Sequence, residues 1–383
     1  MRKSLFCGAA LAALAVASTA QADDANVTSG LQLKISGRIG FLAGLSLTDN
    51  GTEKFDRDYD FASGARMQFD IKNVTDSGLE YGARIRFNNV NRRQDVTVDR
   101  TYVYVKGDFG TVTFGDAPYI AEDIGVVYAH QTLATKFGLD TDWADGFRSS
   151  ANTFGGSDRF FAVAAYDTIG GLSNKDTKIK YTSPNLAGFS FGVDFTPVVG
   201  GNGHAGNGGR NDLFNDSSTL YENVIGGGVD YSQSFDGTAV RLAATAYNGN
   251  GVSGNHDFEA YTLGGQVGFA NAFWASVNWT HFSSMYQTDK AIDSIVGDLS
   301  YTTGPWLASV GYAYTTAEKG NGLDSSFTDG QDLKTNHSVI GTLVYNLAPG
   351  LNLFSELRYE KNEFRVGKDF ETSALTAGTV LTF

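Results

Sequence analysis

The sequence predicts an all-β protein, a 16-stranded antiparallel transmembrane β-barrel. Three observations favour this fold: apolar and polar residues alternate with a period of two, short turns alternate with long polar segments, and the mean hydropathy is −0.19 although 42% of the residues are hydrophobic. Successive side chains of a strand point to opposite faces, so a strand between lipid and a wet lumen is apolar on one face only. A closed sheet also leaves no edge with unpaired backbone groups, and the hydrocarbon core of a membrane offers such groups no other partner.

The first predicted strand shows the alternation clearly. Between Leu31 and Leu47 the apolar side chains fall mostly on odd positions, whereas Lys34, Ser36 and Arg38 fall on even ones. Residues 61–72 and 79–88 repeat the pattern, with most of the even positions again polar or charged. Each segment is therefore predicted to be a strand with one apolar and one polar face.

The predicted connections between strands give the expected number of strands. Short turns are predicted at seven places: Asn73–Gly78, Lys106–Gly110, Ser183–Gly188, Phe235–Gly237, Phe269–Ala272, Thr302–Pro305 and Asn346–Gly350. Eight longer polar segments lie between them: 48–60, 91–97, 117–176, 197–222, 248–258, 283–291, 317–336 and 361–371. Together they join sixteen strands, the last being Thr372–Phe383, and all five prolines fall in connections or at strand ends, where a missing N–H is tolerated.

The N-terminus has the pattern of a secretory signal. Arg2 and Lys3 precede an apolar run from Leu5 to Ala17, and Ala20-Gln21-Ala22 is an A-x-A cleavage site. We therefore expect residues 1–22 to be a signal peptide and residues 23–383 to form the barrel. The only cysteine, Cys7, would leave with the signal, which excludes disulfides, cysteine–zinc sites and cysteine catalysis in the mature chain.

Composition excludes several other classes. The chain has 29 Lys and Arg against 42 Asp and Glu, a net charge of −13, whereas a general nucleic-acid binder needs a basic footprint. After the signal no apolar stretch is long enough for a transmembrane helix. No coherent catalytic set is found, so we do not expect an enzyme.

A secreted β-sandwich, β-helix or surface adhesin is the alternative to the barrel. Two observations favour the barrel: arginines recur on the polar faces of consecutive strands, which indicates a water-filled interior, and aromatic residues gather near strand ends, as in interfacial girdles. Phe383 ends the chain on the same face as Leu381.

Two short motifs and the histidines could indicate other kinds of site. Gly188–Gly192 fits G-x-S-x-G, but a strand follows where a nucleophile elbow needs a helix. Gly201–Gly206 fits G-x-G-x-x-G without the required helix, and with Asp212 this stretch could instead hold a structural Ca²⁺, although a flexible external loop is the simpler interpretation. The mature histidines show no ligand spacing, so we predict no transition-metal site and no cofactor.

On these residues the chain resembles the general diffusion porins of Gram-negative outer membranes, in their alphaproteobacterial form. The resemblance covers the mature chain and is most specific in residues 61–128. It is carried by the segments 33–41, 64–69, 100–110, 113–115, 125–128, 180–184 and 188–189 and by the terminal Phe383.

The resemblance implies a homotrimer in which each protomer forms its own pore, narrowed by an inward-folded third loop. That loop would be 117–176, whose apolar piece 159–168 could be an extra strand. An arginine wall would face carboxylates of the loop. The matching positions are Arg38, Arg66 and Arg100, with Arg84 and Arg86 on the neighbouring strand; the candidate loop acids are Glu122, Asp123, Asp140, Asp142 and Asp145.

The expected function is passive diffusion of ions and small hydrophilic solutes, with outer-membrane lipid and lipopolysaccharide around the barrel. The alternative is a substrate-selective channel, for sugars or anions, of similar fold. Residues 23–106 contain as many acids as bases, and residues 107–383 carry the whole excess of acids. Because rings of charge bias ion selectivity, we expect mild cation preference.

Overall fold

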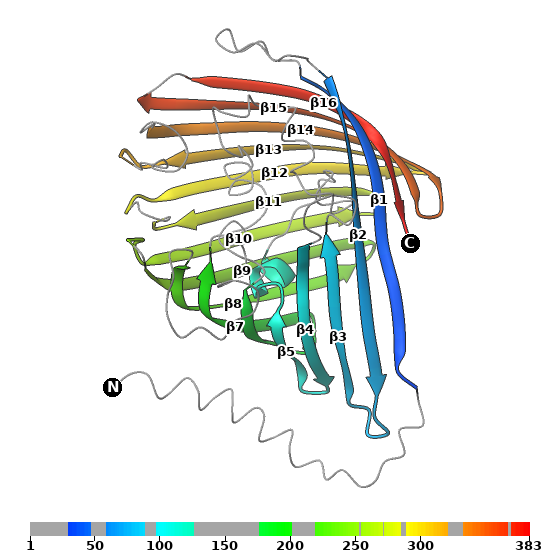
Figure 1. Cartoon of the computed structure of the whole chain (residues 1–383). Helices are drawn as coiled ribbons and strands as arrows, with labels where there is room; N and C mark the ends of the chain where they lie inside the picture. The colour runs from blue at the N-terminus through cyan, green and yellow to red at the C-terminus, as the bar shows by residue number, and fades with distance from the viewer. Residues whose placement is uncertain are drawn as a thin grey trace.

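The structure is a computed structural model of the chain. It describes residues 30–46, 59–88, 97–125, 176–200, 219–252, 254–270, 272–284, 289–320, 332–366 and 369–383. In these ranges sixteen strands form one closed antiparallel barrel, which confirms the predicted fold class (Figure 1). The strands are β1 (Gln32–Ser46), β2 (Tyr59–Val74), β3 (Glu80–Asn88), β4 (Thr97–Gly107), β5 (Gly110–Asp116), β6 (Thr177–Thr182), β7 (Phe189–Gly200), β8 (Thr219–Phe235), β9 (Thr238–Gly251), β10 (Phe258–Phe269), β11 (Phe273–Phe282), β12 (Ile292–Thr303), β13 (Trp306–Ala317), β14 (Asp332–Ala348), β15 (Leu351–Val366) and β16 (Phe370–Thr382).

The first and last strands close the barrel. β1 pairs with β16 in a register that places Arg38 opposite Thr382, and the two strands lie side by side in Figure 1. Gly37 and Phe383 exchange two backbone hydrogen bonds, of 2.9 and 3.1 Å. A Cβ on Gly37 would lie 2.9 Å from the Phe383 ring, so the small residue makes room for the terminal side chain.

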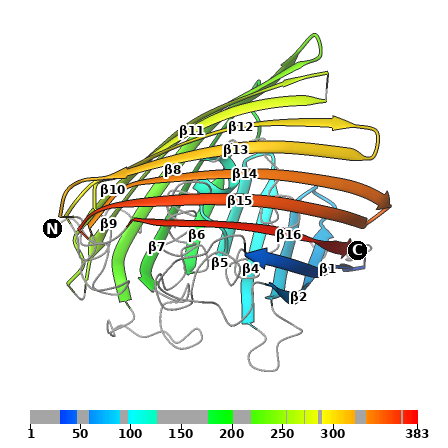
Figure 2. The ribbon, with the colours of Figure 1, turned by 90° about the horizontal axis from the view of Figure 1, so that it is seen from above.

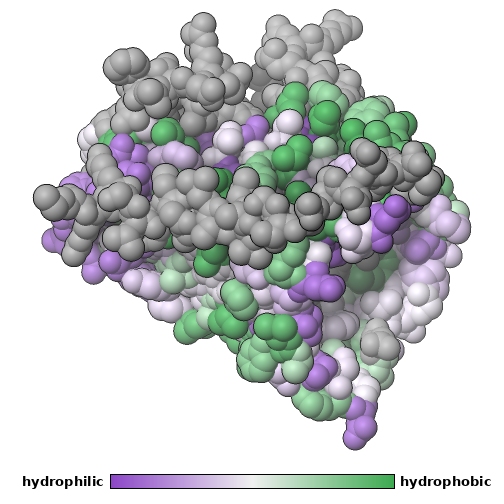
Figure 3. Space-filling model, turned by 90° about the horizontal axis from the view of Figure 1, so that it is seen from below, coloured by the Kyte–Doolittle hydropathy of each residue, from purple (hydrophilic) through white to green (hydrophobic). Residues whose placement is uncertain are grey.

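The outer wall is apolar, as the alternation predicted. Leu33, Ile39 and Leu263 are each more than half exposed, whereas polar side chains such as Asn336 and Glu356 are fully buried. In Figure 3 hydrophobic side chains gather in clusters on the face seen from below, with hydrophilic ones between them. No helix in the described ranges is long and apolar enough to cross a membrane.

Because neighbouring strands are antiparallel, the strand ends that border the predicted long connections lie at one end of the barrel and the predicted short turns lie at the other. β5 pairs directly with β6, with Thr111 opposite Thr182, so no strand of the wall lies between these two. The piece 159–168 lies outside the described residues. Seen from above, β12 to β16 follow one another in chain order around the wall (Figure 2).

Several strand boundaries differ from the sequence prediction. Pro197 lies inside β7, where the partner position on β8 is Asn223, a residue with a positive φ of 53°; the local irregularity removes the need for a proline N–H. β14 begins at Asp332 and β15 runs to Val366, inside segments predicted as loops. There Arg365 binds the Asp332 carboxylate at 3.2 Å, so polar residues that suggested loops instead pair across strands.

Candidate functional site

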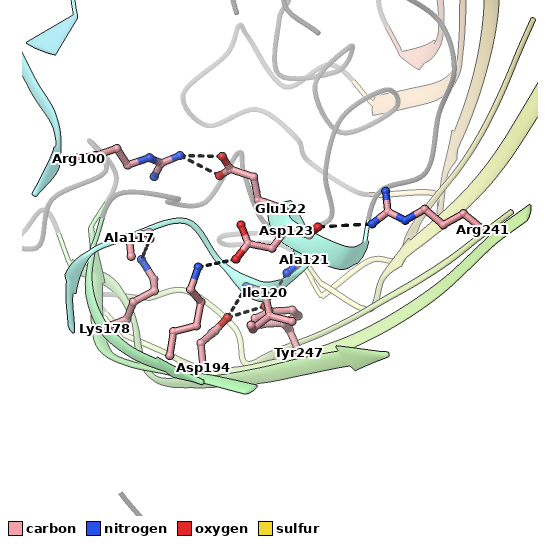
Figure 4. Close-up of polar contacts among 11 residues, drawn as sticks. Arg100, Ala117, Ile120, Ala121, Glu122, Asp123, Lys178, Asp194, Arg241 and Tyr247 are labelled. Carbon is pink, nitrogen blue, oxygen red and sulfur yellow. Dashed lines mark hydrogen bonds and ion pairs between the residues drawn. The ribbon is translucent and has the colours of Figure 1, made fainter. Parts of the chain in front are cut away.

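The segment that follows β5 turns into the barrel and is anchored there by buried polar contacts. It continues into a π-helical turn, η1 (Ala121–Gly125), and the side chains of Tyr119 and Ile120 are fully buried. The Ile120 N–H donates to the Asp194 carboxylate at 2.7 Å, and Tyr247 donates its hydroxyl to the same oxygen at 2.7 Å. The Ala121 N–H in turn donates to the Tyr247 hydroxyl at 3.0 Å (Figure 4). Two wall strands, β7 and β9, therefore hold the start of loop three.

Glycines on the wall make this close approach possible. A Cβ on Gly192 would lie 2.4 Å from the Ile120 side chain. A Cβ on Gly226 would lie 1.9 Å from the Tyr247 ring. Gly192 belongs to the G-x-S-x-G motif, whose last four residues lie on β7, and its lack of a side chain serves packing.

A buried lysine fixes the other side of the same segment. Lys178, on β6, donates to the carbonyl oxygen of Ala117 at 2.6 Å and to that of Asp176. Its ammonium also lies 4.5 Å from the centre of the Tyr119 ring, within the range of a cation–π contact. The cation thereby holds the two ends of the long loop together at the wall.

Two acids of the anchored segment, Glu122 and Asp123, each contact a basic residue of a different wall strand. Arg100, on β4, donates to both carboxylate oxygens of Glu122, at 3.0 and 2.9 Å. Asp123 binds the Lys180 ammonium of β6 at 2.5 Å, and Figure 4 shows Arg241 of β9 reaching the Asp123 carbonyl oxygen. The acids are 38% and 35% exposed but Arg100 and Lys180 only 3% and 7%, so the carboxylates face the lumen from a buried basic support.

Burial raises the pKa of Asp123 above its ordinary value, and the nearby Lys180 ammonium opposes this by favouring the charged form. Glu122 lies beside it and adds to the rise. The group therefore takes up a proton more readily than an exposed aspartate.

The five predicted arginines form a ladder on the lumen face of the first four strands. Arg38 lies opposite Arg66 in the register of β1 and β2, and Arg86 lies opposite Arg100 in that of β3 and β4. Arg66 donates to the Asn88 side chain. Arg84 binds Asp70 at 2.6 Å and lies 5.8 Å from the centre of the Tyr102 ring, so its nearest acid is on the wall.

Of the predicted loop acids, Glu122 and Asp123 lie at this site, whereas Asp140, Asp142 and Asp145 lie outside the described residues. The candidate Ca²⁺ stretch around Asp212 also lies outside them. Within the described ranges no group of three or more His, Cys, Asp or Glu side chains could hold a metal ion.

Sequence reasoning missed the bases Lys180 and Arg241 and the anchors Asp194 and Tyr247. The alternation in Thr177–Thr182 signalled that Lys178 and Lys180 share one face. It could not show that this face meets residues more than 50 positions away in the chain.

Comparisons with known proteins agree with this architecture. A family model described as Gram-negative porin matches residues 9–365, while no individual curated protein sequence matches the chain. The anion-selective porin from Comamonas acidovorans is similar with a TM-score of 0.59 and 17% identity, over 92% of this chain and 100% of that one. OmpF of Salmonella typhi, solved with daunomycin, gives 0.61 and 14% over 92% and 98%, and the trimer form of OmpT from Vibrio cholerae gives 0.58 and 13% over 93% and 100%.

Proposed function

Since this chain belongs to the Gram-negative porin family, we propose that it forms a water-filled channel for passive diffusion of ions and small hydrophilic solutes, narrowed where η1 meets the arginine wall. The family match and the closed barrel support an outer-membrane diffusion channel. We assign the narrowing of this channel to residues of η1 and of the arginine wall.

The pair Arg100–Glu122 supports this assignment best. It joins the wall to a segment inside the barrel by direct contact, so a buried positive charge and a partly exposed negative charge lie together at the edge of the lumen. The field of these charges and of the neighbouring arginines would orient the lumen water beside them, and an apolar solute would have to disrupt that water. Guanidinium suits the wall because it stays charged at any ordinary pH.

The remaining predicted residues would add further charges to the electric field in the lumen. Arg38, Arg66 and Arg86 continue the positive wall beside Arg100, and Asp123 adds a second acid opposite Lys180. Asp140, Asp142 and Asp145 remain proposed partners further along loop three. Because the excess of acids lies after residue 106, the channel should prefer cations mildly.

The assembly and export of the protein are part of the proposal. It would work as a homotrimer in contact with outer-membrane lipid and lipopolysaccharide; one similar structure, OmpT, is described as a trimer. Residues 1–22 would be a cleaved signal peptide, so N-terminal sequencing of the mature protein should begin at Asp23.

Planar-bilayer recording tests the function directly. Purified, folded protein should add conductance in discrete steps, and a salt gradient should give a reversal potential of the sign expected for cation preference. Folded protein that never conducts would contradict the channel, whereas anion preference would contradict only the proposed selectivity.

A further inference from the structure

A pocket of about 480 Å³ opens on the wall of β1 to β4, between Arg100 and the short-turn end of the barrel. Its polar lining comes chiefly from Lys34, Asp70, Lys72, Arg84, Tyr102 and Tyr104. Its volume falls within the range of small-molecule sites. The pocket is separate from the contacts that hold η1.

One side of the pocket offers a fixed aromatic surface. The Tyr104 ring lies so close over Gly82 that a Cβ there would be 2.8 Å from two ring atoms. The Tyr104 hydroxyl donates to Glu80 at 3.0 Å, which fixes the ring at its far end. Because one face packs on the glycine and the hydroxyl is bound, the ring is held ready for a flat partner.

The charges of the pocket leave one cation uncompensated. Asp70 is bound by Arg84 at 2.6 Å, and Glu80 is bound by Lys72 at 2.6 Å. Lys34 is exposed and lies opposite Asp70 in the register of β1 and β2, but the Asp70 carboxylate is bound by Arg84 and Gln68, and Lys34 makes no ion pair with any residue that the structure describes. The pocket therefore presents a single positive charge beside an aromatic ring.

We propose that this pocket binds a small solute with a flat ring and one carboxylate, the ring against Tyr104 and the carboxylate paired with Lys34. One uncompensated cation matches a monoanion, and a ring without charge would leave Lys34 unpaired. A solute that passes Arg100 and Glu122 towards the short-turn end would meet this subsite next. The inference rests on the proposed channel function and adds the class of solute that the channel retains.

The test uses benzoate as the probe, benzamide as its uncharged counterpart and acetate as a carboxylate without a ring. Millimolar benzoate should reduce single-channel conductance, and benzamide and acetate at equal concentration should not. Lys34→Gln and Tyr104→Leu should each weaken the block by benzoate about fivefold, as expected for the loss of one partly exposed contact. A β-sheet circular dichroism spectrum checks that each variant is folded.

Lys319→Gln is the matched control, because it removes the same charge from an exposed position just after β13. It should leave the block unchanged. Equal block by acetate, or a benzoate block that Lys34→Gln does not alter, would overturn the subsite. Saturation-transfer NMR of benzoate with the folded protein in detergent reads binding without conduction, so failure of the channel function and failure of the subsite remain distinguishable.

Discussion

One nitrogen of the Arg100 guanidinium donates to both carboxylate oxygens of Glu122, at 3.0 and 2.9 Å. The arginine is almost fully buried in the wall, and the glutamate is 38% exposed on η1. The contact thus joins a rigid support to a carboxylate that water and ions can reach. Its two members carry opposite charges, so their removal should have opposite effects on the ions that pass.

Glu122→Gln should shift the selectivity towards anions, and Arg100→Gln should shift it towards cations. A unit charge about 4 Å from an ion is worth about 1 kcal/mol in water, or about fivefold in the ratio of permeabilities. The reversal potential in a salt gradient measures this ratio. Glu259→Gln is the control, because Glu259 is exposed on the outer face of β10; shifts of the same sign in both lumen variants would contradict the assignment.

Tyr247→Phe should loosen the start of loop three. The change removes the hydroxyl that donates to Asp194 and accepts from Ala121, and each buried group left unsatisfied costs about 1–3 kcal/mol. We expect a lower urea midpoint and a noisier open-channel current. Tyr231→Phe is the control, since Tyr231 makes only a ring contact with Phe189 among the interactions described for it. Equal current noise in the two variants would argue against the anchor.

Gly226→Ala tests the same anchor through packing. The new methyl would lie 1.9 Å from the Tyr247 ring, and overpacking of this kind costs about 1–3 kcal/mol. Gly341→Ala is the matched control, because a Cβ there meets nothing within 4 Å. Alanine is favoured over glycine in a strand by roughly 0.5–1 kcal/mol, so the control should be slightly more stable than the wild type. Urea unfolding of both variants, followed by circular dichroism, measures the difference; a Gly226→Ala protein as stable as the control would contradict it.

The sequence predicted the barrel well because a period of two is a direct consequence of strand geometry, and lipid on one side of the wall makes that period visible. It located Leu33 on the outside and Arg38 on the inside from parity alone. Parity assigns a side chain to a face but does not give its position around the barrel. Lys180 and Arg241 were therefore missed, although both meet Asp123.

Local composition also misplaced some strand ends. Polar residues near 332–336 and 361–366 suggested loops because their long-range partners, such as Asp332 for Arg365, are not visible in a local window. Pro197 was expected in a loop because the irregular backbone of its partner Asn223 leaves no signal in the sequence. Glu122 and Asp123 were candidates because the family resemblance implied acids on loop three, and the structure places both on η1, a few residues after the end of β5.

The pH dependence of selectivity should depend on Asp123. Burial raises the pKa of this carboxyl, so it becomes neutral at a higher pH than an exposed aspartate, whose pKa is about 3.9. The folded protein then binds this proton more tightly than the unfolded chain. The group therefore opposes folding at pH values above both pKa values, and its penalty is relieved as the pH falls through the folded value.

As the pH is lowered from about 7 to about 4, the wild-type channel should lose part of its cation preference when Asp123 takes up a proton. Asp123→Asn should lack this first step and should already be shifted towards anions at neutral pH. Asp236→Asn is the control, because Asp236 is exposed in a short turn with a φ of 46°, a conformation that asparagine adopts readily. Reversal potentials recorded at each pH decide the matter: if the Asp123→Asn profile coincides with those of the wild type and the control, another group sets the pH dependence.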